Sequence, residues 1–181
     1  MKLPVLVVAG LCVAVAGVSV AGVSVAGVSA QGVTDAQIAS IVLTANQVDI
    51  DAGKLAASKA TDPQVKAFGQ QMVTDHTGVN KQATELAGKL KVKPEDNPTS
   101  QSLEAAGDKN LAKLKGLSGA AFDKAYIAHE VAYHQQVIDA LDKTLIPGAK
   151  NEELKALLVK VRPAFVAHLE HAKKVQASLG K

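Results

Sequence analysis

The sequence predicts an all-α fold, a four-helix bundle with one long crossover connection. Downstream of residue 40 the apolar residues recur at spacings of three and four, which is the pattern of amphipathic helices. The chain is rich in alanine, its aromatic content is only 3%, and tryptophan is absent, a composition that suits closely packed helices better than sheets. The connections between successive apolar stripes are short, then long, then short, which sets the topology. A chain of 181 residues is long enough for one domain with a proper core.

The first thirty residues differ from the rest of the chain. They carry one charge, Lys2, followed by a long apolar run that ends in the small residues Val-Ser-Ala at Ala30. This pattern predicts a signal peptide over residues 1–30 and a single mature domain over residues 31–181, located in the periplasm or secreted. An uncleaved run of this length would instead anchor the domain in a membrane. The only cysteine, Cys12, lies in this segment, so the mature domain has no thiol for catalysis or metal ligation.

Two long helices are predicted in the first half of the mature chain. The first covers roughly 35–60, with Thr34 or Asp35 as its N-cap. The second covers roughly 63–91, with Asp62 as its N-cap and a proline at its first helical position. Because the link between them is only a few residues long, we expect antiparallel neighbours.

A polar segment with two prolines then breaks the helical pattern, and three further helices follow. They are a short helix over 102–116, a long helix over roughly 119–145, and a last helix that begins after Asn151 and extends to about Leu179. Pro163 lies inside the last helix, where we expect a kink or a local break. A short extra helix in the long connection between the second and third long helices gives a ferritin-like bundle, in which those two long helices start at the same end.

Polar side chains interrupt the apolar stripes on several helices. His76, His134 and His168 occupy stripe positions on three different helices, and Asp49 lies at the edge of the first stripe. A rise of 1.5 Å per residue places Asp49, His76 and His134 within about 5 Å of one another along the bundle axis, with His168 roughly 7 Å away. Because neutral imidazole and carboxylate groups bind zinc, copper, iron or nickel, we predict that these four residues form a transition-metal site.

Neighbouring residues complete this prediction. Asp75 and Glu130 are expected to accept hydrogen bonds that orient the imidazoles. His129 is expected to be structural. His171 is expected to lie at the surface, the alternative being that it pairs with His168 on a metal. Metal binding should weaken as the pH falls toward about 6, because protonated imidazole cannot ligate. The alternative is a purely structural polar network, in which the core histidines hydrogen-bond to Asp49 or to a tyrosine.

Several function classes are disfavoured. The chain has no Glu-x-x-His pair of the kind found in di-iron bundles, no Gly-x-Ser-x-Gly, no phosphate loop and no His-Glu-x-x-His, so an enzyme is less expected than a binding protein. The formal charge is only +3, with the signs well mixed and no basic tract, so no nucleic-acid partner is expected. No specific membrane contact is expected once residues 1–30 are removed. Protein partners are not indicated, and a homo-oligomer stays open.

Four segments together carry a resemblance to a known family. They are "GKLA" at 53–56 after Asp49, "VKAFGQQMVTDHT" at 65–77, "LSGAAFDKAYIAHEVAYHQ" at 117–135 and "RPAFVAHLEHA" at 162–172. They resemble the bacterial domain family numbered 4142, a domain of unknown function related to ferritin-like bundles, over roughly 34–177. The family pattern carries over onto Asp75, His76, Phe122, Asp123, Tyr126, His134, Pro163 and His168. Asp49 stands where the family has Glu. The resemblance implies a helical bundle and export, and no activity.

The sequence therefore predicts an exported helical bundle that binds a transition metal in its core. Storage, buffering or stress protection in the cell envelope are the roles that such a site would serve. A structural or interaction module of the periplasm is the second hypothesis, and an enzyme that uses the metal is the third.

Overall fold

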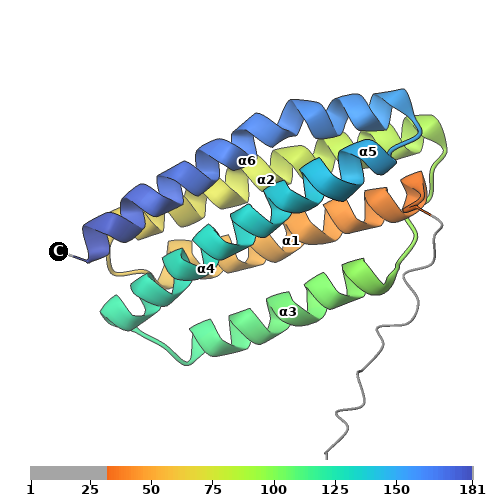
Figure 1. The fold of residues 1–181 in the computed structure, drawn as a ribbon. Coiled ribbons are helices and arrows are strands. Elements are labelled where there is room, and N and C mark those ends of the chain that lie inside the picture. Colours follow the sequence, from red (N-terminus) through yellow and green to blue (C-terminus); the bar gives the residue numbers. More distant parts are fainter. Residues whose placement is uncertain (1–31, 181) are drawn as a thin grey trace, which may run out of the picture. The chain divides into compact units, whose positions relative to one another are not determined.

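A computed structural model describes residues 32–180, which are helical apart from short connections (Figure 1). The four long helices are α1 (Asp35–Lys59), α2 (Pro63–Leu90), α4 (Gly119–Ala140) and α6 (Glu152–Leu179). The shorter α3 (Pro98–Lys115) lies in the long connection between α2 and α4. No strand occurs within residues 32–180. The predicted all-α bundle with an extra helix in its long connection is confirmed, whereas the predicted signal peptide lies outside the described residues.

The helices begin at the capping residues that the sequence indicates. Thr34 accepts a hydrogen bond from the backbone N–H of Gln37, and the Gln37 side chain accepts one from Thr34 in return. Asp62 caps α2, and Asn151 caps α6 in the same way. These caps satisfy N–H groups that have no partner within the helix, so they fix where each helix starts.

The long helices pack as two antiparallel pairs, α1 with α2 and α4 with α6 (Figure 1). The start of α4 is tied to the turn between α1 and α2, because the Asp123 carboxylate accepts hydrogen bonds from the backbone N–H groups of Thr61 at 3.1 Å and Asp62 at 2.9 Å. The helices α2 and α4 therefore begin at the same end of the bundle, as the long crossover requires. The crossover helix α3 packs outside the four, mainly against α1.

The first pair approaches closely because two glycines face each other. A Cβ atom added to Gly53 on α1 would lie 2.8 Å from the backbone oxygen of Gly69 on α2, and one added to Gly69 would lie 2.8 Å from the Cβ of Ala56. No larger residue fits at this crossing without moving the backbones apart. The spacing between α1 and α2, and hence between the side chains that they direct into the core, is set here.

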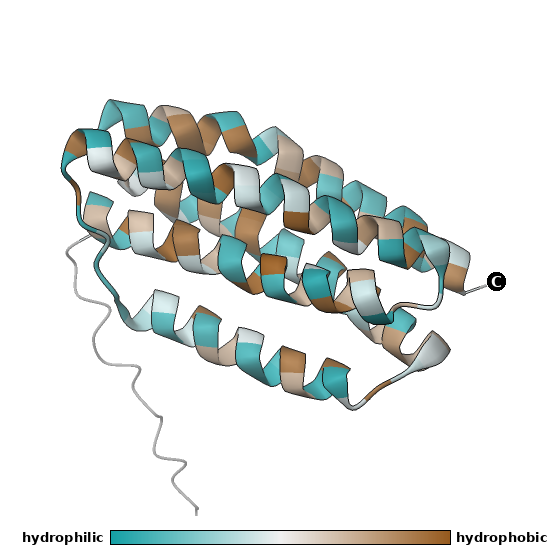
Figure 2. Ribbon diagram, turned by 180° about the vertical axis from the view of Figure 1, so that it is seen from behind, coloured by the Kyte–Doolittle hydropathy of each residue, from teal (hydrophilic) through white to brown (hydrophobic). Residues whose placement is uncertain are grey.

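Two apolar clusters fill the bundle, and apolar segments recur along each long helix in Figure 2. One cluster contains Ile38, Ile41 and Val42 of α1 with the C-terminal part of α4, and the other contains Ala52 and Ala56 of α1 with the N-terminal part of α4. On α1, α2 and α4 a buried polar residue lies between the stretches that belong to the two clusters, and on α6 His168 lies at their border, next to Leu169 of the first cluster. A polar layer thus separates the two halves of the core.

The structure departs from the predicted elements at three places. The helix α6 continues without interruption through Pro163, so the predicted local break is absent. Pro163 is exposed, and the carbonyl that it leaves unpaired can bond to water on the solvent side. An irregularity that was not predicted lies at Leu141–Leu145, a π-helical segment that leads into the single turn α5 (Ile146–Gly148). The crossover helix α3 also starts earlier than predicted, because Asn97 caps it.

None of the helices within residues 32–180 combines the length and the apolar character that crossing a membrane requires.

Candidate metal centre

All four long helices contribute a polar side chain to one buried layer. Asp49 comes from α1, His76 from α2, His134 from α4 and His168 from α6, and none of these residues is more than 3% exposed. The imidazole centroids lie 5.6 Å apart for His76 and His134, 5.3 Å for His76 and His168, and 5.4 Å for His134 and His168. The structure thus brings together the four residues predicted from the sequence, and it adds Glu130 of α4, which is 1% exposed.

His76 is held in one orientation by Asn46. The Nδ1–H of His76 donates to Asn46 Oδ1 at 2.7 Å, and Asn46 Nδ2 donates to the carbonyl oxygen of Val42 at 2.8 Å. Because the amide nitrogen of Asn46 is engaged by Val42, its oxygen is the atom that faces the imidazole. The proton of the neutral ring therefore sits on Nδ1, which leaves the lone pair of Nε2 free.

His134 and His168 are also oriented by a hydrogen bond through one ring nitrogen. The Nδ1–H of His134 donates to the backbone oxygen of Glu130 at 3.1 Å, one helical turn earlier, which leaves Nε2 free. The Nε2–H of His168 donates to Asp75 Oδ2 at 2.9 Å, which leaves Nδ1 free. Each imidazole thus donates through one nitrogen and turns the other, unprotonated nitrogen into the core.

Two of the three free nitrogens, those of His76 and His134, lie beside the carboxylate of Asp49. Its Oδ2 lies 3.1 Å from His76 Nε2 and 3.4 Å from His134 Nε2. Neither contact has the alignment of a hydrogen bond, and within residues 32–180 no hydrogen-bond partner reaches His76 Nε2, His134 Nε2, His168 Nδ1 or the carboxylate oxygens of Asp49 and Glu130. Two sets of potential ligand atoms lie within 4.8 Å of one another, namely His76 with His134 and His168, and Asp49 with Glu130 and His134. These groups can hold a metal ion.

Burial keeps the imidazoles neutral. It lowers the pKa of His76 well below the usual value, and the neighbouring histidines lower it further. It lowers the pKa of His134 to about 4. It also lowers the pKa of His168, although the hydrogen bond with Asp75 acts in the opposite direction. At neutral pH all three rings are therefore in the form that ligates a metal.

The two carboxyl groups respond to burial in the opposite direction. Burial raises the pKa of Asp49 to about 7, and the adjacent carboxyl group of Glu130 acts in the opposite direction. Burial and the charge of Asp49 raise the pKa of Glu130 well above its usual value. The pKa values of Tyr126 and Tyr133 are raised as well, first by burial and then by these two carboxylates. Without a cation, the carboxyl pair retains a proton near neutral pH.

Two residues that contribute to the candidate metal centre were not assigned to it from the sequence. Glu130 was expected only to orient an imidazole, yet its carboxylate belongs to one of the two ligand sets. The signal was present, because Glu130 and His134 are four residues apart and therefore share a helix face. Asn46 was not singled out at all, since one polar residue in α1 has no distinguishing pattern. Asp75 orients His168 as expected, and His129 stacks on Tyr133 with centroids 5.5 Å apart, outside the ligand sets.

His171, which was expected at the surface, is half-buried and lies outside both ligand sets. It contacts the Gln71 side chain at 3.0 Å and the edge of the Phe68 ring, with centroids 5.2 Å apart. Its surroundings are those of a histidine that packs between α2 and α6.

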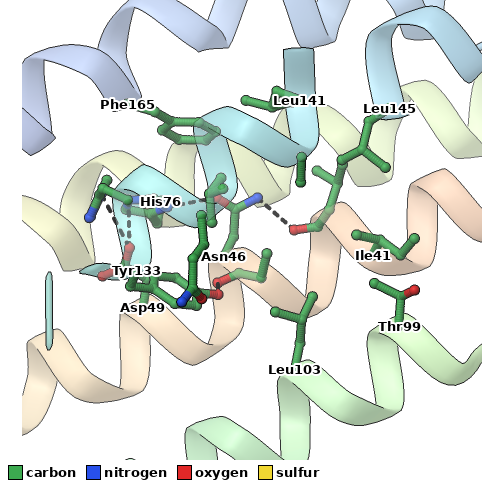
Figure 3. A pocket seen from close by; sticks show the side chains of 16 residues that line it. Ile41, Asn46, Asp49, His76, Thr99, Leu103, Tyr133, Leu141, Leu145 and Phe165 are labelled. Carbon is green, nitrogen blue, oxygen red and sulfur yellow. Dashed lines mark hydrogen bonds and ion pairs between the residues drawn. The ribbon is translucent and has the colours of Figure 1, made fainter. Parts of the chain in front are cut away.

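A pocket of about 220 Å³ adjoins the polar layer, between α1, α3 and the C-terminal part of α4. Figure 3 shows Asp49, His76 and Tyr133 together on one side of it, with Ile41 and Thr99 on the other. The layer is thus open to a pocket on the side that faces the crossover helix.

Comparisons with known proteins identify the family of the chain. Neither a search of curated proteins nor a search of solved structures finds a significant match. The family described as "Domain of unknown function (DUF4142)" matches residues 22–175, which include all four long helices almost completely and every residue of the polar layer. The chain belongs to this family, the domain of unknown function DUF4142.

Proposed function

We propose that the bundle binds one transition-metal ion through His76, His134, His168 and Asp49, with Glu130 beside them, and that it serves to store or buffer this metal in the cell envelope. The observation that supports the proposal best is the orientation of the three imidazoles. Each is fixed by a hydrogen bond through one nitrogen and leaves its other nitrogen without a hydrogen-bond partner, and the free nitrogens of His76 and His134 lie 3.1 and 3.4 Å from one oxygen of the buried Asp49 carboxylate.

Electrostatics supports a cation at this place. When Asp49 is ionised, its Oδ2 faces the lone pairs of two unprotonated imidazole nitrogens at 3.1 and 3.4 Å. In a medium of low dielectric constant this arrangement is repulsive. A cation between the three atoms turns this repulsion into coordination. Ligand atoms about 2.1 Å from a shared ion lie about 3.0 Å apart at right angles and about 3.4 Å apart in a tetrahedron. The two observed separations fall in this range.

The types of ligand atom restrict which metal ions the site would bind. Three imidazoles and a carboxylate suit zinc, copper(II), iron or nickel, whereas magnesium and calcium prefer sites built of oxygen atoms. Among the described residues the ligand sets contain no thiolate, since the only cysteine is Cys12. The envelope as the place of action is supported by the predicted signal peptide over residues 1–30.

The proposal is tested by measuring the metal content and the metal affinity of the full chain. The chain is produced without a polyhistidine tag, and bound metal is first removed with a chelator. After reloading and dialysis, elemental analysis should give one ion per chain for the wild type. His134→Ala should lower the affinity at least 100-fold, because it removes a ligand shared by both sets. The matched control is His129→Ala, a histidine on the same helix that lies outside the ligand sets.

Two results would contradict the proposal. One is a wild-type chain that retains no metal, which would leave the layer as a structural polar network in which a protonated Asp49 bonds to the histidines. The other is equal loss of metal from His134→Ala and His129→Ala, which would place the binding elsewhere.

A further inference from the structure

The pocket beside the polar layer has a polar inner end and an open mouth. Asp49, His76 and His134 line it, whereas His168 and Glu130 do not. Two other lining residues, Thr99 of α3 and Gln136 of α4, are exposed, so the pocket reaches the surface beside them. An ion held by the ligand atoms of the layer would therefore be enclosed by protein on the side of His168 and would face the pocket on the other.

Between its mouth and its inner end the pocket is apolar. Side chains from three helices and from the π-helical segment form its walls: Ile41, Val42, Leu103, Val137, Ala140 and Leu145. None of the residues that line it is a lysine or an arginine, and the only carboxylate is that of Asp49. An anionic molecule would find no cationic side chain among these residues. The chemistry of the walls selects an uncharged, mainly apolar occupant.

The size of the pocket sets the size of that occupant. Its volume of about 220 Å³ exceeds that of an engineered apolar cavity of about 150 Å³ that binds benzene. A closed store of metal would have no use for such a space, because an ion needs only its ligands and a narrow path. The space is large enough for a molecule somewhat bigger than a single aromatic ring.

We propose that the pocket binds a small uncharged molecule with an apolar body and one donor atom, of the azole or phenol class, whose donor ligates the ion on the side that Asp49, His76 and His134 leave open. This inference rests on the proposed function, since it requires an ion in the layer. It adds to that function a ligand-binding step, so that the bound metal carries a recognition site as well as being stored.

The test uses the full chain loaded with cobalt(II), whose visible absorption reports its coordination. The probes are 4-phenylimidazole and imidazole, which share a donor and differ by a phenyl ring. Both should change the cobalt spectrum, and 4-phenylimidazole should do so with at least tenfold higher affinity, because its ring is removed from water by the pocket walls. Cobalt content is measured again after each titration, so that extraction of the metal is recognised.

A filled pocket provides the decisive comparison. Ala140→Phe places a ring among the lining residues and should abolish the advantage of 4-phenylimidazole while cobalt binding is retained. Ala132→Phe is the matched control on the same helix, because Ala132 is exposed and does not line the pocket, and it should keep that advantage. Leu103→Trp, which fills the pocket from α3, replaces Ala140→Phe if that variant does not fold.

The outcomes separate the two proposals. A chain that binds cobalt but prefers neither probe, or that keeps the preference in both filled variants, overturns the pocket proposal and leaves the metal site intact. A chain that binds no cobalt overturns the proposed function, and the pocket proposal with it.

Discussion

At the scale of single residues, the centre depends on Asn46, which hydrogen-bonds to His76 and belongs to neither ligand set. Its amide joins the backbone of α1 to the His76 ring through hydrogen bonds of 2.8 and 2.7 Å. Without it, the Nδ1–H of His76 would be buried without an acceptor, and the ring would be free to rotate or to change tautomer. Asn46 thus holds the lone pair of Nε2 toward Asp49.

We predict that Asn46→Ala weakens metal affinity by roughly 10- to 100-fold, the range found when the partner of a ligating histidine is removed. Asn80→Ala is the matched control, since Asn80 also donates an amide hydrogen bond to a backbone oxygen of α1, that of Leu43, but does not contact a histidine of the layer. Competition with a chelator of known affinity measures both variants. Equal affinities for the two variants would show that Asn46 does not orient His76.

The proton that competes with the metal is carried by the carboxyl groups rather than by the imidazoles. The sequence led us to expect that imidazole protonation near pH 6 limits binding, but burial lowers the pKa of His134 to about 4. Burial raises the pKa of Asp49 to about 7, so the metal-free protein still holds a proton there when the pH is below about 7. A metal ion has to displace this proton.

Affinity should accordingly rise about tenfold per pH unit for each displaced proton up to about pH 7, and level off above it if Asp49 is the last carboxyl to ionise. Asp49→Asn should bind more weakly at every pH and show a smaller slope. The dissociation constant, measured between pH 5.5 and 9, checks both statements. A slope that is unchanged in Asp49→Asn would assign the proton to another group, Glu130 being the nearest candidate.

Stability is a poorer readout of the same groups, because their contributions oppose each other. The folded pKa of Asp49 is raised, so its contribution to stability is lost as the pH rises from about 4 toward 7. The folded pKa of His134 is lowered, so its contribution is lost as the pH falls from about 6.5 toward 4. Between about pH 4 and 6.5 the two slopes partly cancel.

At the scale of the elements, the crossing of α1 and α2 sets the distance between Asp49 and His76. Gly53 lies one turn after Asp49, and Gly69 lies two turns before His76, so the close contact of the two glycines adjoins the site. The glycine in the "GKLA" segment thus has a packing role next to the ligand that precedes it.

We predict that Gly69→Ala lowers the free energy of unfolding by about 1–3 kcal/mol, because its methyl group has no room at the crossing. Gly78→Ala is the matched control on the same helix. No atom lies within 4 Å of the added Cβ there, so this change should stabilise the protein by about 0.5–1 kcal/mol. Denaturant unfolding of the metal-free protein measures both. Stabilisation by both substitutions would show that the helices do not touch at Gly69.

The helix starts and buried faces were predictable because they depend on local sequence patterns. Asp62 and Asn151 are capping residues in the sequence and in the structure, and the apolar stripes mark the buried faces. The position of His168 along the bundle axis was not predictable. Residues were counted from Ile146 on the assumption that the long helix ends at residue 145. The helical path in fact continues to Gly148, so His134 lies 148 − 134 = 14 residues from that end and His168 lies 168 − 152 = 16 from the start of α6. The predicted offset of roughly 7 Å for His168 thus falls to two residues, or about 3 Å.

The site was predictable in part for the same reason. The helix faces of His76, His134 and His168 follow from periodicity, whereas the tautomers depend on contacts between helices, such as that of Asn46 with His76. The pocket depends on how α3 packs beside α1 and α4, and no pattern in the sequence of α3 specifies that placement. Long-range packing, rather than local propensity, decides these features.

At the scale of the whole molecule, the polar layer divides the core and makes the metal-free protein less stable than its helices permit. Two buried carboxyl groups and three imidazoles occupy the place where apolar side chains would pack. A bundle selected for stability alone would not retain an uncompensated acidic pair between two apolar clusters. The layer is therefore expected to oppose stability and to serve binding.

We predict that the double variant Asp49→Asn, Glu130→Gln makes the metal-free protein more stable at pH 8, by about 1–4 kcal/mol, because the amides have nearly the same shape and do not ionise. Metal should raise the melting temperature of the wild type and leave that of the double variant unchanged. Thermal unfolding with and without metal checks both. A double variant that is less stable than the metal-free wild type would mean that the carboxyl groups hold the core together.

The most direct test of the proposed metal centre is a crystal structure of the metal-loaded protein, with anomalous diffraction recorded at the absorption edge of the metal. We predict one anomalous peak within residues 32–180, at about 2.0–2.2 Å from His76 Nε2, His134 Nε2, His168 Nδ1 and an Asp49 oxygen. We also expect Asn46 and Asp75 to keep their hydrogen bonds to the outer nitrogens of His76 and His168. A peak on His129 or His171, or a fully loaded crystal with no peak in the polar layer, would contradict the proposed metal centre.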